Sequence, residues 1–171
     1  MELYFVRHVQ PAVAPGTCYG QIDVPLTDGY DEIHQRIALD IGTFDAVYTS
    51  PLTRCRLLAE HLSSDYVSDA RLKELNFGEW EGMKWDEIDR GMMDDWGVNY
   101  ITSGPPGGES LQELVNRLDA FLKELPAVDR VVIVTHAGVI RAAMHLLEGV
   151  PIDKIMSERI YYGGVYTFNL L

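Results

Sequence analysis

Two apolar, strand-like segments of this chain each end in a histidine. The first is Tyr4-Phe5-Val6-Arg7-His8 near the start, and the second is Val132-Ile133-Val134-Thr135-His136-Ala137-Gly138 near the end. A buried strand that ends at a titratable residue places that side chain at the carboxyl edge of a sheet, where α/β folds bind ligands. The repetition therefore predicts a site that contains two imidazoles.

A third strand-like segment delivers a further cation to the same edge. Residues 45–49 read as a strand and are followed by Ser50-Pro51-Leu52-Thr53-Arg54, where a helix is predicted to open. Arg54 thus joins Arg7 as a second arginine near the two histidines.

The alternation of strand and helix patterns predicts the fold class. Strand patterns lie at residues 3–7, 46–49, 66–68, 130–135 and 165–170, and helical patterns lie at 27–39, 50–62, 109–125 and between His136 and Gly149. Thr27 and Asp28 are the N-cap candidates of the first helix. This order predicts an α/β sandwich with a largely parallel sheet, formed as a single domain over residues 1–171. Residues 77–108 show weak periodicity, so we expect an insertion that flanks the site.

Composition narrows the possible partners. The chain of 171 residues carries 14 basic and 26 acidic residues, a formal net charge of −12, which disfavours nucleic acids and anionic membranes. It opens directly in strand pattern, without a signal peptide or a long apolar segment, so we expect a cytoplasmic protein. Cys18 and Cys55 lack the spacing of metal ligands and are expected to be free thiols. The residues thus predict neither a metal nor a cofactor.

The residues gathered at the predicted edge suit phosphoryl transfer. An arginine guanidinium matches the geometry of phosphate oxygens, and a neutral imidazole can attack phosphorus without a metal. Arg7, His8, Arg54 and His136 fit these needs. An alkoxide leaving group requires a proton, which a carboxylic acid can donate. Candidates for this acid are Glu74, Glu79 and Glu81.

Five blocks, which cover nearly the whole chain in order, resemble the histidine phosphatase superfamily, whose fold is phosphoglycerate-mutase-like. The blocks are Val6-Arg7-His8, Ser50-Pro51-Leu52-Thr53-Arg54, Leu72-Lys73-Glu74-Leu75-Asn76-Phe77-Gly78-Glu79-Trp80-Glu81-Gly82, Pro106-Gly107-Gly108-Glu109-Ser110 and Val134-Thr135-His136-Ala137-Gly138. The resemblance implies a three-layer α/β/α sandwich with a mostly parallel central sheet. It also implies a metal-independent phosphomonoesterase that acts on a small phosphorylated metabolite.

The resemblance assigns roles to the predicted site residues. It implies that His8 is the phosphorylated nucleophile and that Arg7, Arg54 and His136 hold the phosphoryl group together with it. Glu74 is implied to be the acid and base, because it lies four residues before Gly78, as the family's acid lies before its glycine. We expect further substrate contacts from the loop after His8 and from the entry of the helix after Gly108, at Gln10, Tyr19, Gln21, Glu109 and Ser110.

Within the superfamily, residues 16–26 are similar to the corresponding stretch of the alpha-ribazole phosphatases of the cobalamin pathway. The resemblance therefore implies alpha-ribazole 5′-phosphate as the substrate. The chain departs from the family pattern directly after the nucleophile, where Val9 replaces the usual glycine. A valine does not take positive φ cheaply, so this loop is expected to turn within ordinary backbone regions.

Two other functions remain open at this point. A phosphoglycerate mutase would use the same residues but return the phosphoryl group to a substrate instead of releasing it to water. A catalytically silent module would keep the arginines and bind a phosphorylated ligand without turnover. The presence of Glu74 together with all four phosphate-site residues argues against the silent module.

Overall fold

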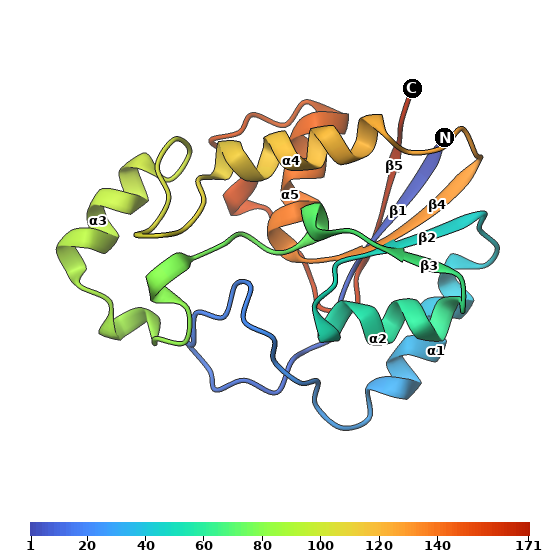
Figure 1. Cartoon of the computed structure of the whole chain (residues 1–171), viewed down its shortest axis with the longest axis horizontal. Helices are drawn as coiled ribbons and strands as arrows, with labels where there is room; N and C mark the ends of the chain where they lie inside the picture. The colour runs from blue at the N-terminus through green and yellow to red at the C-terminus, as the bar shows by residue number, and fades with distance from the viewer.

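A five-stranded sheet forms the centre of the molecule in the computed structural model, which describes all of residues 1–171. Its strands are β1 (Glu2–Arg7), β2 (Ala46–Thr49), β3 (Tyr66–Ser68), β4 (Arg130–Thr135) and β5 (Val165–Asn169), in the spatial order β3-β2-β4-β1-β5. All neighbouring pairs are parallel except β1 and β5. The predicted α/β fold with a mostly parallel sheet is confirmed (Figure 1).

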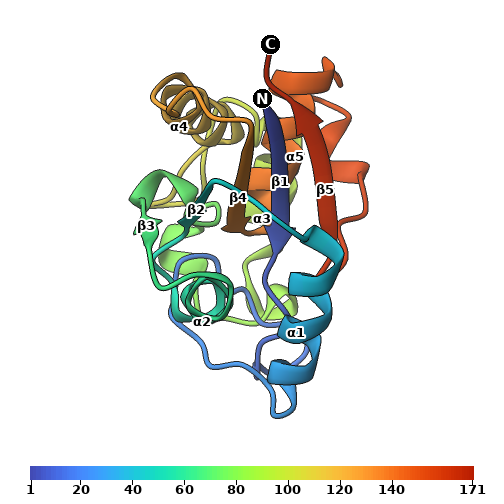
Figure 2. The same ribbon diagram turned by 90° about the vertical axis from the view of Figure 1, so that its right-hand side faces the viewer.

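Helices cover both faces of this sheet. The helices are α1 (Tyr30–Ile41), α2 (Thr53–Leu62), α3 (Arg90–Asn99), α4 (Leu111–Lys123) and α5 (Ala137–Glu148), with single 3-10 turns at Ala70–Leu72, Gly78–Trp80, Trp85–Glu87 and Ile155–Ser157. Apolar residues of α1 and α2 pack on one face, and those of α4 and α5 pack on the other. Figure 2 shows the sheet between these two helix pairs.

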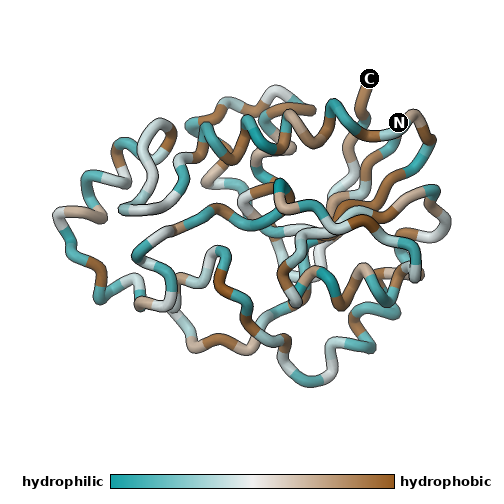
Figure 3. Tube along the Cα trace, viewed as in Figure 1, coloured by the Kyte–Doolittle hydropathy of each residue, from teal (hydrophilic) through white to brown (hydrophobic).

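The two helix layers exist because the central strands are apolar on both faces. In β1, Leu3 and Phe5 contact the α4 and α5 side, whereas Val6 contacts the α1 and α2 side. Residues 131–134 of β4 are all completely buried and alternate between the same two sides. Such continuous apolar runs are typical of parallel strands buried on both faces. Figure 3 shows these strands as a hydrophobic group in the right-hand half of the view, whereas polar and hydrophobic residues alternate along the helices.

Three helices differ from the sequence prediction. Helix α2 begins at Thr53 rather than at Ser50. Helix α1 begins at Tyr30 rather than at Thr27, because the Thr27 hydroxyl and backbone N–H both donate to the Gln10 carbonyl and hold Thr27 in the preceding loop. Helix α3 lies within the predicted insertion and was missed. Its two glycines weaken the helical pattern, and its packing depends on Trp96, which contacts a distant cluster around Trp80.

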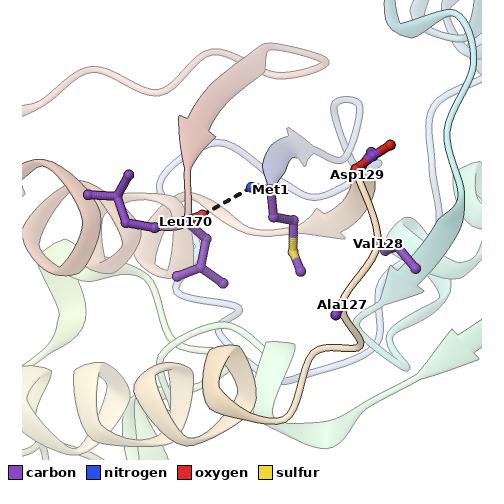
Figure 4. Close-up of a pocket in the computed structure, with 6 residues that line it drawn as sticks. Met1, Ala127, Val128, Asp129 and Leu170 are labelled. Carbon is purple, nitrogen blue, oxygen red and sulfur yellow. Dashed lines mark hydrogen bonds between the residues drawn. The ribbon is translucent and has the colours of Figure 1, made fainter.

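The strand register brings the predicted site residues together. Arg7 is paired with Thr135, and Thr49 is paired with Val134, so β1, β4 and β2 end side by side. The opposite edge holds both termini, where the Met1 ammonium donates to the Leu170 carbonyl (Figure 4). The hollow drawn there, of about 380 Å³, therefore lies away from the histidines. None of the helices has the length and apolar character needed to span a bilayer.

Candidate active site

His8 lies directly after β1, and one of its two ring nitrogens, Nδ1, is hydrogen-bonded to the backbone. Its Nδ1 is 2.7 Å from the backbone carbonyl of Val9, which can only accept a hydrogen bond, so Nδ1 carries the proton. Nε2 forms no hydrogen bond within the protein. Burial, followed by the positive charge of Arg54, lowers the pKa of His8 well below its usual value. His8 therefore presents a neutral imidazole with a free lone pair on Nε2.

The backbone after His8 accommodates Val9 without strain. No residue other than glycine has a positive φ in this structure. The Val9 side chain is buried with Val6 and Ile37 in the cluster between the sheet and helices α1 and α2. The departure from the family glycine thus fills the core beneath the loop.

His136 faces His8 from the end of β4. The ring centroids are 5.1 Å apart and the ring planes are inclined by 64°. The His136 Nε2 atom lies 2.8 Å from the Ser50 hydroxyl, and its ring is completely buried. Burial is the main cause that lowers the pKa of His136 well below its usual value, followed by the proximity of His8. Unlike His8, His136 has its Nε2 occupied by a protein partner.

Arg7 and Arg54 flank the two histidines without any acidic partner. Arg54 is completely buried, and its two terminal nitrogens donate to the carbonyls of Gly20 and Ile22. Arg7 donates to the carbonyl of Ile160 at 2.6 Å. Neither arginine forms an ion pair, and the buried Nε of each has no hydrogen-bond partner. Because an unpaired buried charge is costly, this arrangement is suited to an anion that accepts from both arginines.

The carboxyl group of Glu74 sits at the N-terminus of helix α5. It accepts hydrogen bonds from the backbone N–H groups of Leu75, at 2.8 Å, and Gly138, at 3.1 Å. A Cβ atom at Gly138 would lie 2.2 Å from Glu74 Oε1, so only glycine permits this approach. Of the other candidate acids, Glu79 is exposed, and Glu81 accepts from the backbone N–H groups of Gln21 and Phe77. Glu74 is thus the candidate carboxyl that contacts the helix following His136.

Of the five residues expected to contact the substrate, two lie beside Arg54 or a neighbouring hollow, and three form hydrogen bonds or ion pairs within the protein. Tyr19 lies over Arg54, and Gln10 lines a hollow beside Tyr19. The other three are engaged in internal structure. Gln21 donates to the Glu74 carbonyl, Glu109 pairs with Arg117, and Ser110 caps helix α4.

Several residues of the site carried no recognised signal in the sequence. Tyr162 covers the guanidinium of Arg7, with 3.7 Å from the Arg7 Cζ atom to the ring centroid. Arg117 donates to the backbone carbonyl of Glu74 and so helps to fix that segment. Ser50 opens the Ser50-Pro51-Leu52-Thr53-Arg54 motif, but its hydrogen bond to His136 could be found only from the pairing of β2 with β4.

Comparisons with known proteins give independent evidence of what this chain is similar to. The model of the histidine phosphatase superfamily (branch 1) matches residues 3–170. Phosphoserine phosphatase 1 of Hydrogenobacter thermophilus is 29% identical over 92% of this chain and 81% of its own. A 2,3-bisphosphoglycerate-dependent phosphoglycerate mutase of Azorhizobium caulinodans is 31% identical over 98% of this chain and 91% of its own. The crystal structure of the alpha-ribazole phosphatase from Shigella flexneri matches with a TM-score of 0.88 at 26% identity, over 100% of this chain and 91% of that chain.

Proposed function

Since the chain belongs to the histidine phosphatase superfamily (branch 1) and is a phosphoric monoester hydrolase, we propose that it acts through a phosphohistidine on His8. The observation that carries this proposal is the pair of arginines, Arg7 and Arg54, whose buried Nε donors lack partners beside a neutral His8. A phosphate dianion beside the two guanidinium groups would balance their positive charge and face the free Nε2 of His8.

In the first step, His8 Nε2 attacks phosphorus in line with the leaving oxygen. A bond forms between nitrogen and phosphorus while the bond from phosphorus to the ester oxygen breaks. Arg7, Arg54 and His136 stabilise the charge on the phosphoryl oxygens. Glu74 gives a proton to the departing alkoxide and is left as the carboxylate.

In the second step, water attacks phosphorus and Glu74 takes a proton from that water. The bond between phosphorus and Nε2 breaks, and its electron pair returns to the imidazole. The Val9 carbonyl keeps the proton on Nδ1 throughout, so His8 ends each cycle in the tautomer in which it began.

We propose alpha-ribazole 5′-phosphate of the cobalamin pathway as the substrate. Support comes from the similarity of residues 16–26 to alpha-ribazole phosphatases and from the likeness to the Shigella flexneri enzyme. The mutase relative supports a second candidate function, phosphoryl transfer between phosphoglycerates. The two candidates differ in whether the phosphoryl group reaches water.

An assay on the EDTA-treated protein tests this function. We expect inorganic phosphate to be released from alpha-ribazole 5′-phosphate with a higher kcat/KM than from 3-phosphoglycerate or p-nitrophenyl phosphate. Transfer between phosphoglycerates without phosphate release would instead identify a mutase. Tight binding of the esters without any turnover would identify the silent binding module.

Replacement of Arg54 by alanine should lower kcat/KM by on the order of 100-fold, equivalent to about 3 kcal/mol, as for the loss of one preorganised donor to a transition-state oxyanion. Arg56→Ala is the matched control, because Arg56 is exposed and pairs with Glu60 one helical turn away. Steady-state kinetics on both variants check this prediction. A wild-type rate for Arg54→Ala would remove Arg54 from the mechanism.

A further inference from the structure

Two tyrosines from distant parts of the chain meet over the phosphate-binding residues. The hydroxyl groups of Tyr19 and Tyr162 lie 2.9 Å apart, although 143 positions separate them in sequence. The Tyr162 ring lies over Arg7, with its centroid 5.8 Å from that of His8, and the Tyr19 ring lies 5.1 Å from the Arg54 Cζ atom. Each phosphate-binding arginine therefore has an aromatic ring on its guanidinium.

The Tyr19 phenol stays uncharged in this position. Burial, followed by the hydrogen bond with Tyr162, raises the pKa of the Tyr19 hydroxyl. The Tyr19 phenol thus adds no negative charge that would repel a phosphate. Tyr162 keeps 41% of its surface exposed, so its ring remains accessible from outside the site.

A hollow of about 180 Å³ adjoins the two tyrosines. Its remaining wall is the loop after His8, from Gln10 to Thr17, which contributes the carbon surfaces of Pro11, Val13 and Pro15. No acidic or basic side chain lines it. Such a lining, apolar and aromatic with a few amide and hydroxyl groups, is typical of sites for uncharged organic groups.

We propose that Tyr19 and Tyr162 determine substrate specificity by stacking an aromatic, uncharged leaving group beside the bound phosphate. This inference rests on the proposed function, because it places the alcohol part of the ester in the adjoining hollow. A leaving group with a carboxylate would find no cation there. Arg141, on helix α5, donates to the Glu158 carbonyl and does not line the hollow.

Ligand binding tests the subsite independently of turnover. Isothermal titration of benzylphosphonate and methylphosphonate compares two ligands that share the phosphonate but differ in the ring. We expect the wild type to bind benzylphosphonate more tightly, and Tyr19→Leu and Tyr162→Leu each to weaken that binding by about tenfold, the order of one lost aromatic contact. Binding of methylphosphonate should change by less than about twofold. Equal affinity of the wild type for the two ligands would overturn the proposal.

Turnover of two matched esters gives the second readout. The alcohol parts of benzyl phosphate and 3-phosphoglycerate both depart as primary alkoxides. The two esters therefore differ mainly in the aromatic ring of the first and the carboxylate of the second. The leucine variants should lower kcat/KM about tenfold on benzyl phosphate alone, whereas Tyr19→Phe and Tyr162→Phe should keep the preference because they keep the rings. Equal losses on both esters would overturn the proposal.

The adjacent Tyr161 provides the matched control. Its ring is 58% exposed and lies over Arg159, so Tyr161→Leu should leave both the affinities and the kinetics unchanged. A loss of the benzyl preference in Tyr161→Leu would overturn the assignment to Tyr19 and Tyr162. If no ester released phosphate, the proposed function would be refuted. The subsite proposal would still be tested by the phosphonate titrations, which do not depend on turnover.

Discussion

Replacement of His8 by asparagine should lower kcat by roughly 10⁶-fold, the order of loss when a covalent nucleophile is removed from an enzyme. The reason is the free Nε2 of His8, which is the atom that accepts the phosphoryl group in the proposed mechanism. Asparagine keeps a polar side chain of moderate size in a position that is only 2% exposed, so the fold should be retained. Phosphate release and thermal unfolding of the purified variant measure the two effects separately.

A labelling experiment distinguishes His8 from His136 as the nucleophile. Rapid acid-free quenching with a ³²P-labelled ester should trap an acid-labile phosphoprotein in the wild type and none in His8→Asn. His136→Asn should still form it at a reduced rate, because His136 is proposed to assist in holding the phosphoryl group, whereas its Nε2 atom is hydrogen-bonded to Ser50 and is not free to attack phosphorus. If the label were retained in His8→Asn and lost from His136→Asn, His136 and not His8 would be the nucleophile.

The residues that the sequence predicts best are those at the ends of strands. In β4 the residues from Val131 to Val134 are all apolar, so the end of the strand is visible as the change to Thr135 and His136, and His136 is located by that change. The parallel register then brings His8 and His136 together without further information. For the same reason the mostly parallel sheet follows from local patterns alone.

The residues that the sequence does not predict depend on contacts between distant loops. Tyr162 reaches Arg7 through a segment with no helical or strand period, and nothing near residue 162 indicates the partner. Helix α3 is not predicted for the same reason. Its sequence pattern is weak, and the helix is stabilised by contacts of Trp96 with Trp80. Such long-range packing forms the walls of the proposed site, whereas the strand ends place the two histidines.

Replacement of Glu74 by glutamine should slow the hydrolysis of an alkyl ester such as 3-phosphoglycerate by about 10²- to 10⁴-fold, the usual contribution of general acid and base catalysis. The amide cannot supply a proton to the alkoxide or accept one from water. Glutamine nearly matches the shape of glutamate, and its carbonyl oxygen can still accept from the Gly138 N–H group, so the site should stay intact. Steady-state kinetics should show the loss in kcat.

The leaving group separates the acid role of Glu74 from its base role. Nitrophenolate departs without a proton, so Glu74→Gln should release one equivalent of nitrophenol from p-nitrophenyl phosphate in a fast burst and then turn over slowly, because water attack on the phosphoenzyme still needs the base. Glu79→Gln and Glu81→Gln are the matched controls, since one carboxylate is exposed and the other accepts from the backbone N–H groups of Gln21 and Phe77. A burst in either control, or steady wild-type turnover in Glu74→Gln, would move the acid and base role away from Glu74. Because a stalled phosphoenzyme forms only if phosphoryl transfer to His8 precedes water attack, the burst would also establish the order of the two steps.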